Sequence, residues 1–76
     1  MIENEVKKIM SKRFKVDIKS INKNFSFNCV PTWDSIGHIN LMIDLEKKFQ
    51  IKLDSSDTET MLDLKKIIIC LKSYIG

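Results

Sequence analysis

The junction between a turn and a long apolar helical pattern constrains this chain more than any other feature. The turn at Pro31-Thr32 interrupts the preceding segment, and apolar residues then recur at helical spacing over residues 36–49. At roughly 3.6 residues per turn, this pattern fills about four turns of helix. Asp34 offers a carboxylate to the backbone N–H groups that a first helical turn leaves unpaired. The pattern therefore predicts a helix that begins at Ser35, with the serine hydroxyl held at its end.

Size and composition are typical of a small helical globular protein. The chain has 76 residues, of which 43% are hydrophobic, and it contains two glycines and one proline. A domain of this size buries only about 60% of the surface of its unfolded chain, so a pocket with a full catalytic apparatus is hard to fit. We therefore expect one all-α domain over residues 1–76 that is not an enzyme.

The sequence predicts neither membrane insertion nor secretion. No apolar run approaches the roughly 18 residues that a membrane-spanning helix requires. The first five residues include two acidic side chains, where a signal peptide would be basic. We therefore expect a cytoplasmic protein.

The two cysteines, Cys29 and Cys70, have neither the spacing of metal ligands nor that of a redox pair. The chain has one histidine, so the clustered ligands of a zinc site cannot be drawn, and we expect no metal. The simplest interpretation is a pair of partly buried structural thiols in a reducing compartment. A disulfide between them stays open at this stage.

Helical spacing predicts two further long helices and a short one. Residues 2–14 form an amphipathic pattern, and a last helix is expected from Asp63, its N-cap, to the end of the chain. Polar residues 55–59 offer capping groups for a short helix before it. The inner stripe of the last helix is expected to contain Leu64, Ile68, Leu71 and Ile75. Together with residues 35–49, these segments predict a small four-helix bundle with three longer helices and one short third helix.

Residues 15–33 show no sustained period and connect the first helix to the second. Loops of this length are uncommon inside compact domains. Apolar residues recur along the segment at Val16, Ile18, Ile21, Phe25 and Phe27. They predict an ordered loop that packs over the core.

The net charge of +3 is unevenly distributed. Residues 1–33 carry a net charge of +4, and residues 34–59 carry −3. A basic protein invites a nucleic-acid interpretation, but these basic residues are not interleaved with aromatic side chains suited to stacking. A solvated helix face explains them better, so we expect no nucleic-acid partner.

Two apolar stripes follow the helix of residues 35–49 when it is projected at about 100° per residue. One stripe is expected to face the core and contains His38, Leu41, Met42, Leu45 and Phe49. The second contains Ile36, Ile39 and Ile43, and one helix cannot bury both stripes in a small bundle. The second stripe is either a docking surface for partner proteins or is covered by the loop of residues 15–33.

The region around Ser35 resembles the acyl carrier protein family. The likeness rests on Asp34-Ser35-Ile36, on the continuation Leu45-Glu46-Lys47-Lys48-Phe49 and on the Ile51-x-Leu53 exit, and it covers nearly the whole chain. The resemblance implies that Ser35 carries a covalent 4′-phosphopantetheine, which holds acyl or aminoacyl groups as thioesters. The implied partners are a phosphopantetheinyl transferase, a loading enzyme, and downstream transferases or synthases, and we expect a monomer.

The same resemblance implies a set of partner contacts along the second stripe and its acidic neighbours. Carried over to this chain, they are Asp34, Ile36, Ile39, Ile43, Asp44 and Glu46. Carriers of fatty acid synthesis are strongly acidic along this helix, whereas here Gly37 and Asn40 are uncharged and Lys47-Lys48 is basic. This dilutes the usual electrostatic attraction. It favours a specialised biosynthetic pathway with its own matched enzymes.

Two further interpretations concern the residues around the serine. His38 lies one turn after Ser35, but neither an oxyanion-stabilising loop nor a supporting acid is evident, so no nucleophile–base pair is expected. We expect His38 to pack at the edge of the core or to hydrogen-bond the preceding loop, and Trp33 to anchor the corner before the helix. The alternative function is a non-catalytic helical adaptor that binds one partner through the second stripe without modification.

Overall fold

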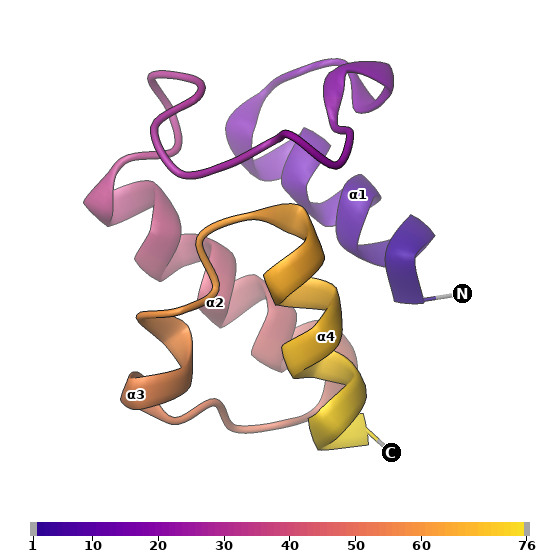
Figure 1. Ribbon diagram of the computed structural model, residues 1–76, viewed down its shortest axis with the longest axis vertical. Helices are drawn as coiled ribbons and strands as arrows, with labels where there is room; N and C mark the ends of the chain where they lie inside the picture. The colour runs from indigo at the N-terminus through magenta and orange to yellow at the C-terminus, as the bar shows by residue number, and fades with distance from the viewer. Residues whose placement is uncertain (1, 76) are drawn as a thin grey trace.

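Amphipathic patterning produces four α-helices in the computed structural model, which describes residues 2–75 (Figure 1). The helices are α1 (Ile2–Phe14), α2 (Ser35–Phe49), α3 (Ser55–Thr58) and α4 (Leu64–Ile75), with a short 3-10 helix, η1 (Ile18–Ser20), in the first loop. Residues 2–75 contain no β-strand, only one isolated bridge between Ser26 and Asp63. The predicted all-α bundle is confirmed.

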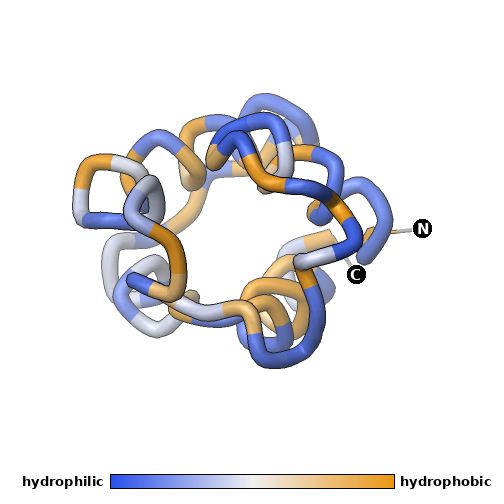
Figure 2. The backbone as a smooth tube through the Cα atoms, turned by 90° about the horizontal axis from the view of Figure 1, so that it is seen from above, coloured by the Kyte–Doolittle hydropathy of each residue, from blue (hydrophilic) through white to orange (hydrophobic). Residues whose placement is uncertain are grey.

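The three long helices share one hydrophobic core, with α1 packed against both α2 and α4. Each long helix contributes a buried stripe, formed by Val6, Met10 and Phe14 of α1, by Leu41, Met42 and Leu45 of α2, and by Leu64, Ile67 and Leu71 of α4. Figure 2 shows apolar and polar segments alternating along the backbone, as expected of amphipathic helices around one core. The other two residues predicted for the core face of α2 are half-buried at the edge of the core: His38 and Phe49.

The buried stripe of α4 differs from the prediction. Ile67, which was assigned to no face, is fully buried, whereas Ile75 is 45% exposed and Ile68 is partly buried. Ile75 is the last residue of α4, where a side chain has fewer neighbours than in the middle of a helix. Ile67 lies three residues after Leu64 and four before Leu71, so it continues the same face of the helix.

The loop of residues 15–33 is ordered and packs on the core, as predicted, with one exception. Ile21 and Phe25 are buried, and Val16 and Phe27 pack partly against the core. Ile18 is 39% exposed, so its predicted role in the core was wrong. It opens η1, which starts where the Asp17 carboxylate accepts a hydrogen bond from the Lys19 backbone N–H, and this turn leaves Ile18 on its outer side. The other four apolar side chains of the loop hold it on the bundle.

Backbone hydrogen bonds attach this loop to the start of α4. The Phe27 N–H donates to the Leu62 carbonyl at 2.8 Å, and the Leu64 N–H donates to the Phe25 carbonyl at 3.1 Å. Asp63 is the predicted N-cap, and its carboxylate accepts a hydrogen bond from the Lys66 N–H at 2.7 Å. The loop and α4 therefore hold each other in place.

The short helix α3 begins differently from the prediction. Asp54 is its N-cap residue but makes no side-chain capping bond, and residues 55–58 form the helix itself. Tyr74 of α4 holds α3 from outside: its hydroxyl donates to the Asp57 carboxylate at 2.5 Å and accepts from the Asp54 N–H at 3.1 Å. The hydrogen bond to Asp57 raises the pKa of Tyr74, because ionisation would bring two negative charges together.

The cysteines are both free thiols, so the open question of a disulfide is answered in the negative. Cys70 is half-buried, and burial, with a smaller contribution from Asp57, raises its pKa. Cys29 is exposed, so the expectation of partial burial was wrong for this residue. Among residues 2–75, no group of three His, Cys, Asp or Glu side chains is placed to hold a metal ion. No helix in this part of the chain has the length and apolar character needed to cross a membrane.

Candidate functional site

The N-terminus of α2 is fixed by the capping group that the sequence predicts. Asp34 has an extended backbone, and its carboxylate accepts a hydrogen bond from the Gly37 N–H at 2.8 Å. The Asp34 carbonyl accepts the first helical bond, from the His38 N–H, at 2.8 Å. Ser35 is the first residue of α2 and is exposed. Its hydroxyl thus stands at the end of a 15-residue helix with free access to solvent.

Trp33 anchors the corner directly before this helix, as predicted. It is fully buried, and its ring stacks on Phe14 with 5.1 Å between centroids and on Phe25 with 5.5 Å. Thr32 adds a connection to α1, because its hydroxyl donates to the Phe14 carbonyl at 2.8 Å. Burial of such large aromatic rings dominates core energetics. The residue two positions before Ser35 is therefore part of the core, which holds the helix start rigidly.

His38 joins this corner to α3 through both nitrogens of its ring. The Trp33 indole N–H donates to His38 Nδ1 at 3.1 Å, and His38 Nε2 lies 2.9 Å from the Thr58 carbonyl. An indole N–H can only donate and a carbonyl can only accept, so Nδ1 is unprotonated and Nε2 carries the hydrogen. His38 was predicted either to pack at the core edge or to hydrogen-bond the preceding loop, and it does both. Neither nitrogen is free to accept a proton from Ser35.

Gly37 is a site residue whose role the sequence analysis missed. It is buried, and a Cβ at this position would lie 2.0 Å from the backbone oxygen of Thr32. Only glycine lets the loop carbonyl approach the first turn of α2 this closely. The signal was present in the sequence, because a glycine inside the first turn of a helix is unfavourable unless close packing requires it.

The second apolar stripe of α2 lies on the surface beside the serine. Ile36 is 70% exposed, Ile39 is 60% exposed and Ile43 is 42% exposed. The alternative in which the loop of residues 15–33 covers them was therefore wrong. We call these three residues the isoleucine strip. Three aligned apolar side chains in solvent mark a surface suited to contact another protein.

Comparisons with known proteins identify the family. No protein-family model matches the chain. The acyl carrier protein of Chlamydia caviae is 29% identical over 75 residues, which cover 99% of this chain and 97% of the relative. That of Lactobacillus johnsonii is 29% identical over 73 residues, 96% of this chain and 91% of the relative. That of Buchnera aphidicola is 30% identical over 67 residues, 88% of this chain and 85% of the relative. The chain belongs to the acyl carrier protein family.

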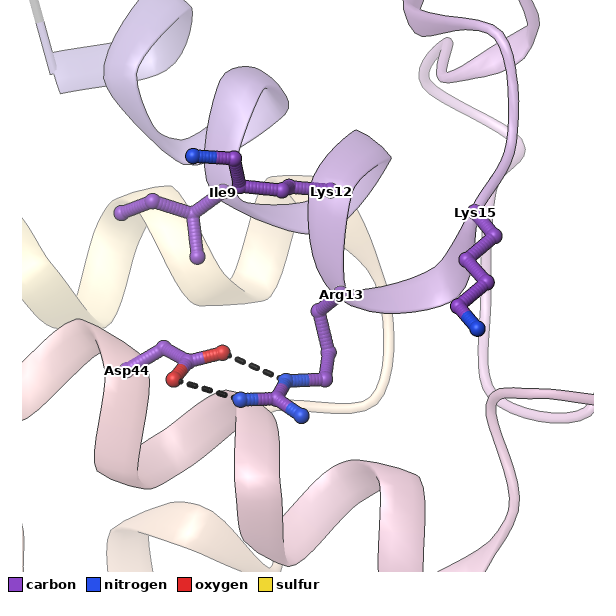
Figure 3. A pocket seen from close by; sticks show the side chains of 5 residues that line it. All are labelled: Ile9, Lys12, Arg13, Lys15 and Asp44. Carbon is purple, nitrogen blue, oxygen red and sulfur yellow. Dashed lines mark hydrogen bonds and ion pairs between the residues drawn. The ribbon is translucent and has the colours of Figure 1, made fainter.

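This membership supports a carrier-protein role. The structure also shows what the acidic residues expected at the partner surface contact. Asp44 forms a two-pronged ion pair with Arg13 of α1, at 2.6 Å to the guanidinium Nε and 2.9 Å to an Nη (Figure 3). This hydrogen-bonded pair raises the pKa of Arg13, with burial acting in the opposite direction. Glu46 accepts a hydrogen bond from the Leu53 N–H at 2.8 Å.

The carrier thus uses all three of the acids predicted for partner binding inside its own fold. Asp34 caps α2, Asp44 links α2 to α1, and Glu46 holds the segment after α2. The isoleucine strip, by contrast, is free at the surface. The sequence predicted that the acids and the strip lie along one helix. It could not show that the carboxylates bind the Gly37 N–H, Arg13 and the Leu53 N–H.

Proposed function

We propose that Ser35 carries a 4′-phosphopantetheine, attached by a phosphopantetheinyl transferase from coenzyme A. The terminal thiol of this arm holds acyl or aminoacyl intermediates as thioesters and presents them to a loading enzyme and to downstream transferases or synthases. In this role the protein is a monomeric cytoplasmic carrier and performs no catalysis itself. The exposed hydroxyl of Ser35 at the capped, rigid start of α2, in a member of the acyl carrier protein family, is the observation that carries the proposal.

The position suits a phosphodiester. The first turn of a helix has unpaired N–H groups and the positive end of the helix dipole, and both favour a nearby anion. Asp34 takes the Gly37 N–H, and the remaining N–H groups of the turn stay available to the phosphate. Ser35 is exposed and the capping bond is made by Asp34, so modification of the serine hydroxyl leaves the cap of α2 intact.

The rigid corner and the isoleucine strip serve two different needs of a carrier. The corner of Trp33 and His38 holds the attachment point still, while the flexible arm moves the cargo. Tethering keeps the cargo at high effective concentration for each enzyme that docks. We propose that enzymes contact Ile36, Ile39 and Ile43, with Asp34, Asp44 and Glu46 at the border of the contact.

The charges along α2 favour a dedicated pathway over housekeeping fatty acid synthesis. Asp44 is neutralised by Arg13, and the last turn of α2 carries two lysines, Lys47 and Lys48, of which Lys48 pairs with Glu5. Electrostatic attraction sets partner choice and association rate more than affinity. A carrier with so little free negative charge on α2 suits enzymes that are matched to it, in a specialised biosynthetic pathway.

Intact mass spectrometry tests the proposal directly. Incubation with coenzyme A and a broad-specificity phosphopantetheinyl transferase should add the mass of one phosphopantetheine group to the wild type and nothing to Ser35→Ala. Ser55→Ala is the matched control, because Ser55 also follows an aspartate and is also the exposed first residue of a helix. It should be primed like the wild type. An unchanged mass for the wild type would contradict the proposal and favour the adaptor function.

A further inference from the structure

The carboxylates beside the isoleucine strip are engaged inside the molecule. Asp44 pairs with Arg13, Glu46 accepts the Leu53 N–H, and Asp34 caps the start of α2. A lysine or arginine of an arriving protein would have to share or displace these bonds, which lowers the net gain from each contact. Arg13 therefore neutralises Asp44, whereas Asp34 and Glu46 keep their negative charge but each have one oxygen engaged within the carrier.

Basic side chains gather next to this helix, on the side of α1. Figure 3 shows Lys12 and Lys15 on either side of Arg13, around a pocket of about 350 Å³ that Ile9 and Asp44 also line. Arg13 is neutralised by Asp44, whereas the two lysines extend into solvent. The pocket rim therefore has an excess of positive charge.

This rim adjoins the isoleucine strip. Asp44 directly follows Ile43, and Lys47 lies one turn further along α2 on the same face as Ile43. Lys12, Lys15 and Lys47 are exposed, and none of them pairs with a carboxylate within residues 2–75. We call these three lysines the basic edge. They are free to meet negative charge on a partner.

The other edge of the strip has a different character. Helical periodicity places Ser35 and Glu46 on the side of the strip opposite Lys47. Glu46 keeps its negative charge, because its partner is the neutral Leu53 N–H, so the docking surface changes sign across its width. An anionic membrane presents the same charge to both edges, whereas a protein surface can match each edge separately. The asymmetry favours a protein partner for the basic edge.

We infer that the enzyme docking on the isoleucine strip meets the basic edge with aspartate and glutamate side chains. The inference rests on the proposed function, because it assigns a charge to the partner of the carrier. Three unpaired lysines beside an apolar strip raise the rate of encounter with a negative surface. The attraction reaches over about 8–10 Å at physiological ionic strength and is screened beyond that distance.

Two synthetic helical peptides test the inference. They share one apolar face of leucine and phenylalanine, and their flanks carry glutamate in one peptide and lysine in the other. Titrated into the ¹⁵N-labelled carrier, the glutamate peptide should bind and shift the amide signals of the isoleucine strip and of Lys12, Lys15 and Lys47. The lysine peptide should bind more weakly at the same site.

Charge-reversed variants make the test specific. Lys12→Glu with Lys15→Glu should weaken binding of the glutamate peptide by about three- to tenfold at low salt, and the difference should fade as salt rises. Lys65→Glu with Lys72→Glu is the matched control on α4, since it changes the net charge equally at two exposed lysines away from the strip. It should bind like the wild type. An equal loss in the control would overturn the inference, as would tighter binding of the lysine peptide.

A vesicle arm and a priming assay complete the design. Preferential binding of phosphatidylcholine–phosphatidylglycerol vesicles at the basic edge would assign the edge to a membrane and overturn the inference. Priming of Ser35 is measured by intact mass on the same preparations. A primed carrier that prefers the lysine peptide keeps the proposed function and loses only this inference. A carrier that cannot be primed loses both.

Discussion

The same dipeptide, Asp-Ser, begins two helices of this molecule, and we propose only the first of the two serines as an attachment site. At α2, the carboxylate of Asp34 caps the helix, and 15 residues follow. At α3, Asp54 makes no side-chain capping bond, and four residues follow. Ser35 and Ser55 are both exposed at the first position of their helices. Exposure and local sequence therefore do not distinguish them.

The difference lies in what stands behind each serine. Trp33 anchors α2 in the aromatic core, and the isoleucine strip continues beyond Ser35. Polar Ser56 and Asp57 follow Ser55, and α3 buries none of its residues. Under the proposed function, the rigid support and the adjacent contact surface distinguish Ser35 from Ser55.

The largest effect on stability is expected in the core beneath α2. This helix buries several of its side chains, whereas α3 buries none of its residues. Leu45→Ala removes a fully buried side chain and should lower the free energy of unfolding by roughly 2–5 kcal/mol. Ile43→Ala, on the exposed face of the same helix, should lower it by about 0.5 kcal/mol or less. Urea denaturation followed by circular dichroism measures both. Equal losses would show that Ile43 belongs to the core and would remove it from the docking surface.

A smaller effect on stability is expected at Gly37, where α2 meets the preceding loop. The matching third position of α3 is an aspartate, Asp57. Gly37→Ala places a Cβ at 2.0 Å from the Thr32 oxygen and should destabilise the fold by about 1–3 kcal/mol. Helix propensity alone predicts the opposite sign, a gain of about 1 kcal/mol. Asn40→Ala, one turn later, is the control and should cause no loss. A stabilised Gly37→Ala protein would contradict the close packing of this corner.

The two capping aspartates should differ when each is replaced. Asp34→Ala removes a carboxylate that accepts a helical N–H, so it should cost about 0.5–2 kcal/mol of unfolding free energy. Asp54→Ala removes no capping bond and should change stability by no more than about 0.5 kcal/mol. Thermal and urea unfolding of the two variants provide the measurement. Similar losses would erase the contrast between the two helix starts.

The smallest effect on stability is expected at the serine itself. Ser35 is exposed, and Asp34 supplies the cap, so Ser35→Ala should change the free energy of unfolding by no more than about 0.5 kcal/mol. Circular dichroism should show unchanged helical content. A large loss would mean that the serine has a structural role, and any effect of this variant on priming would then need a second substitution to interpret.

The helix boundaries could be predicted from the sequence because local signals define them. Asp34 and Asp63 are capping residues, and both accept the expected helical N–H. The sequence analysis placed Ile75 in the buried stripe of α4, whereas the structure buries Ile67. Several apolar residues of this helix fit a helical period equally well. Only the packing of α4 on its neighbours decides which of them is buried.

Contacts between distant segments could not be predicted in this way. The pair of Arg13 and Asp44 spans 31 positions and depends on how α1 lies on α2. The bond between Tyr74 and Asp57 depends on how α4 lies beside α3. These contacts decide which charges are free at the surface, so the charge of the docking surface emerges only from the folded molecule.

Site localisation in the primed wild-type protein tests the central claim most directly. After priming with coenzyme A and a phosphopantetheinyl transferase, the protein is digested, and the peptides are fragmented by tandem mass spectrometry. The account predicts the full phosphopantetheine mass on Ser35 and unmodified Ser55 in the same sample. Modification of Ser55, or of any residue other than Ser35, would contradict it.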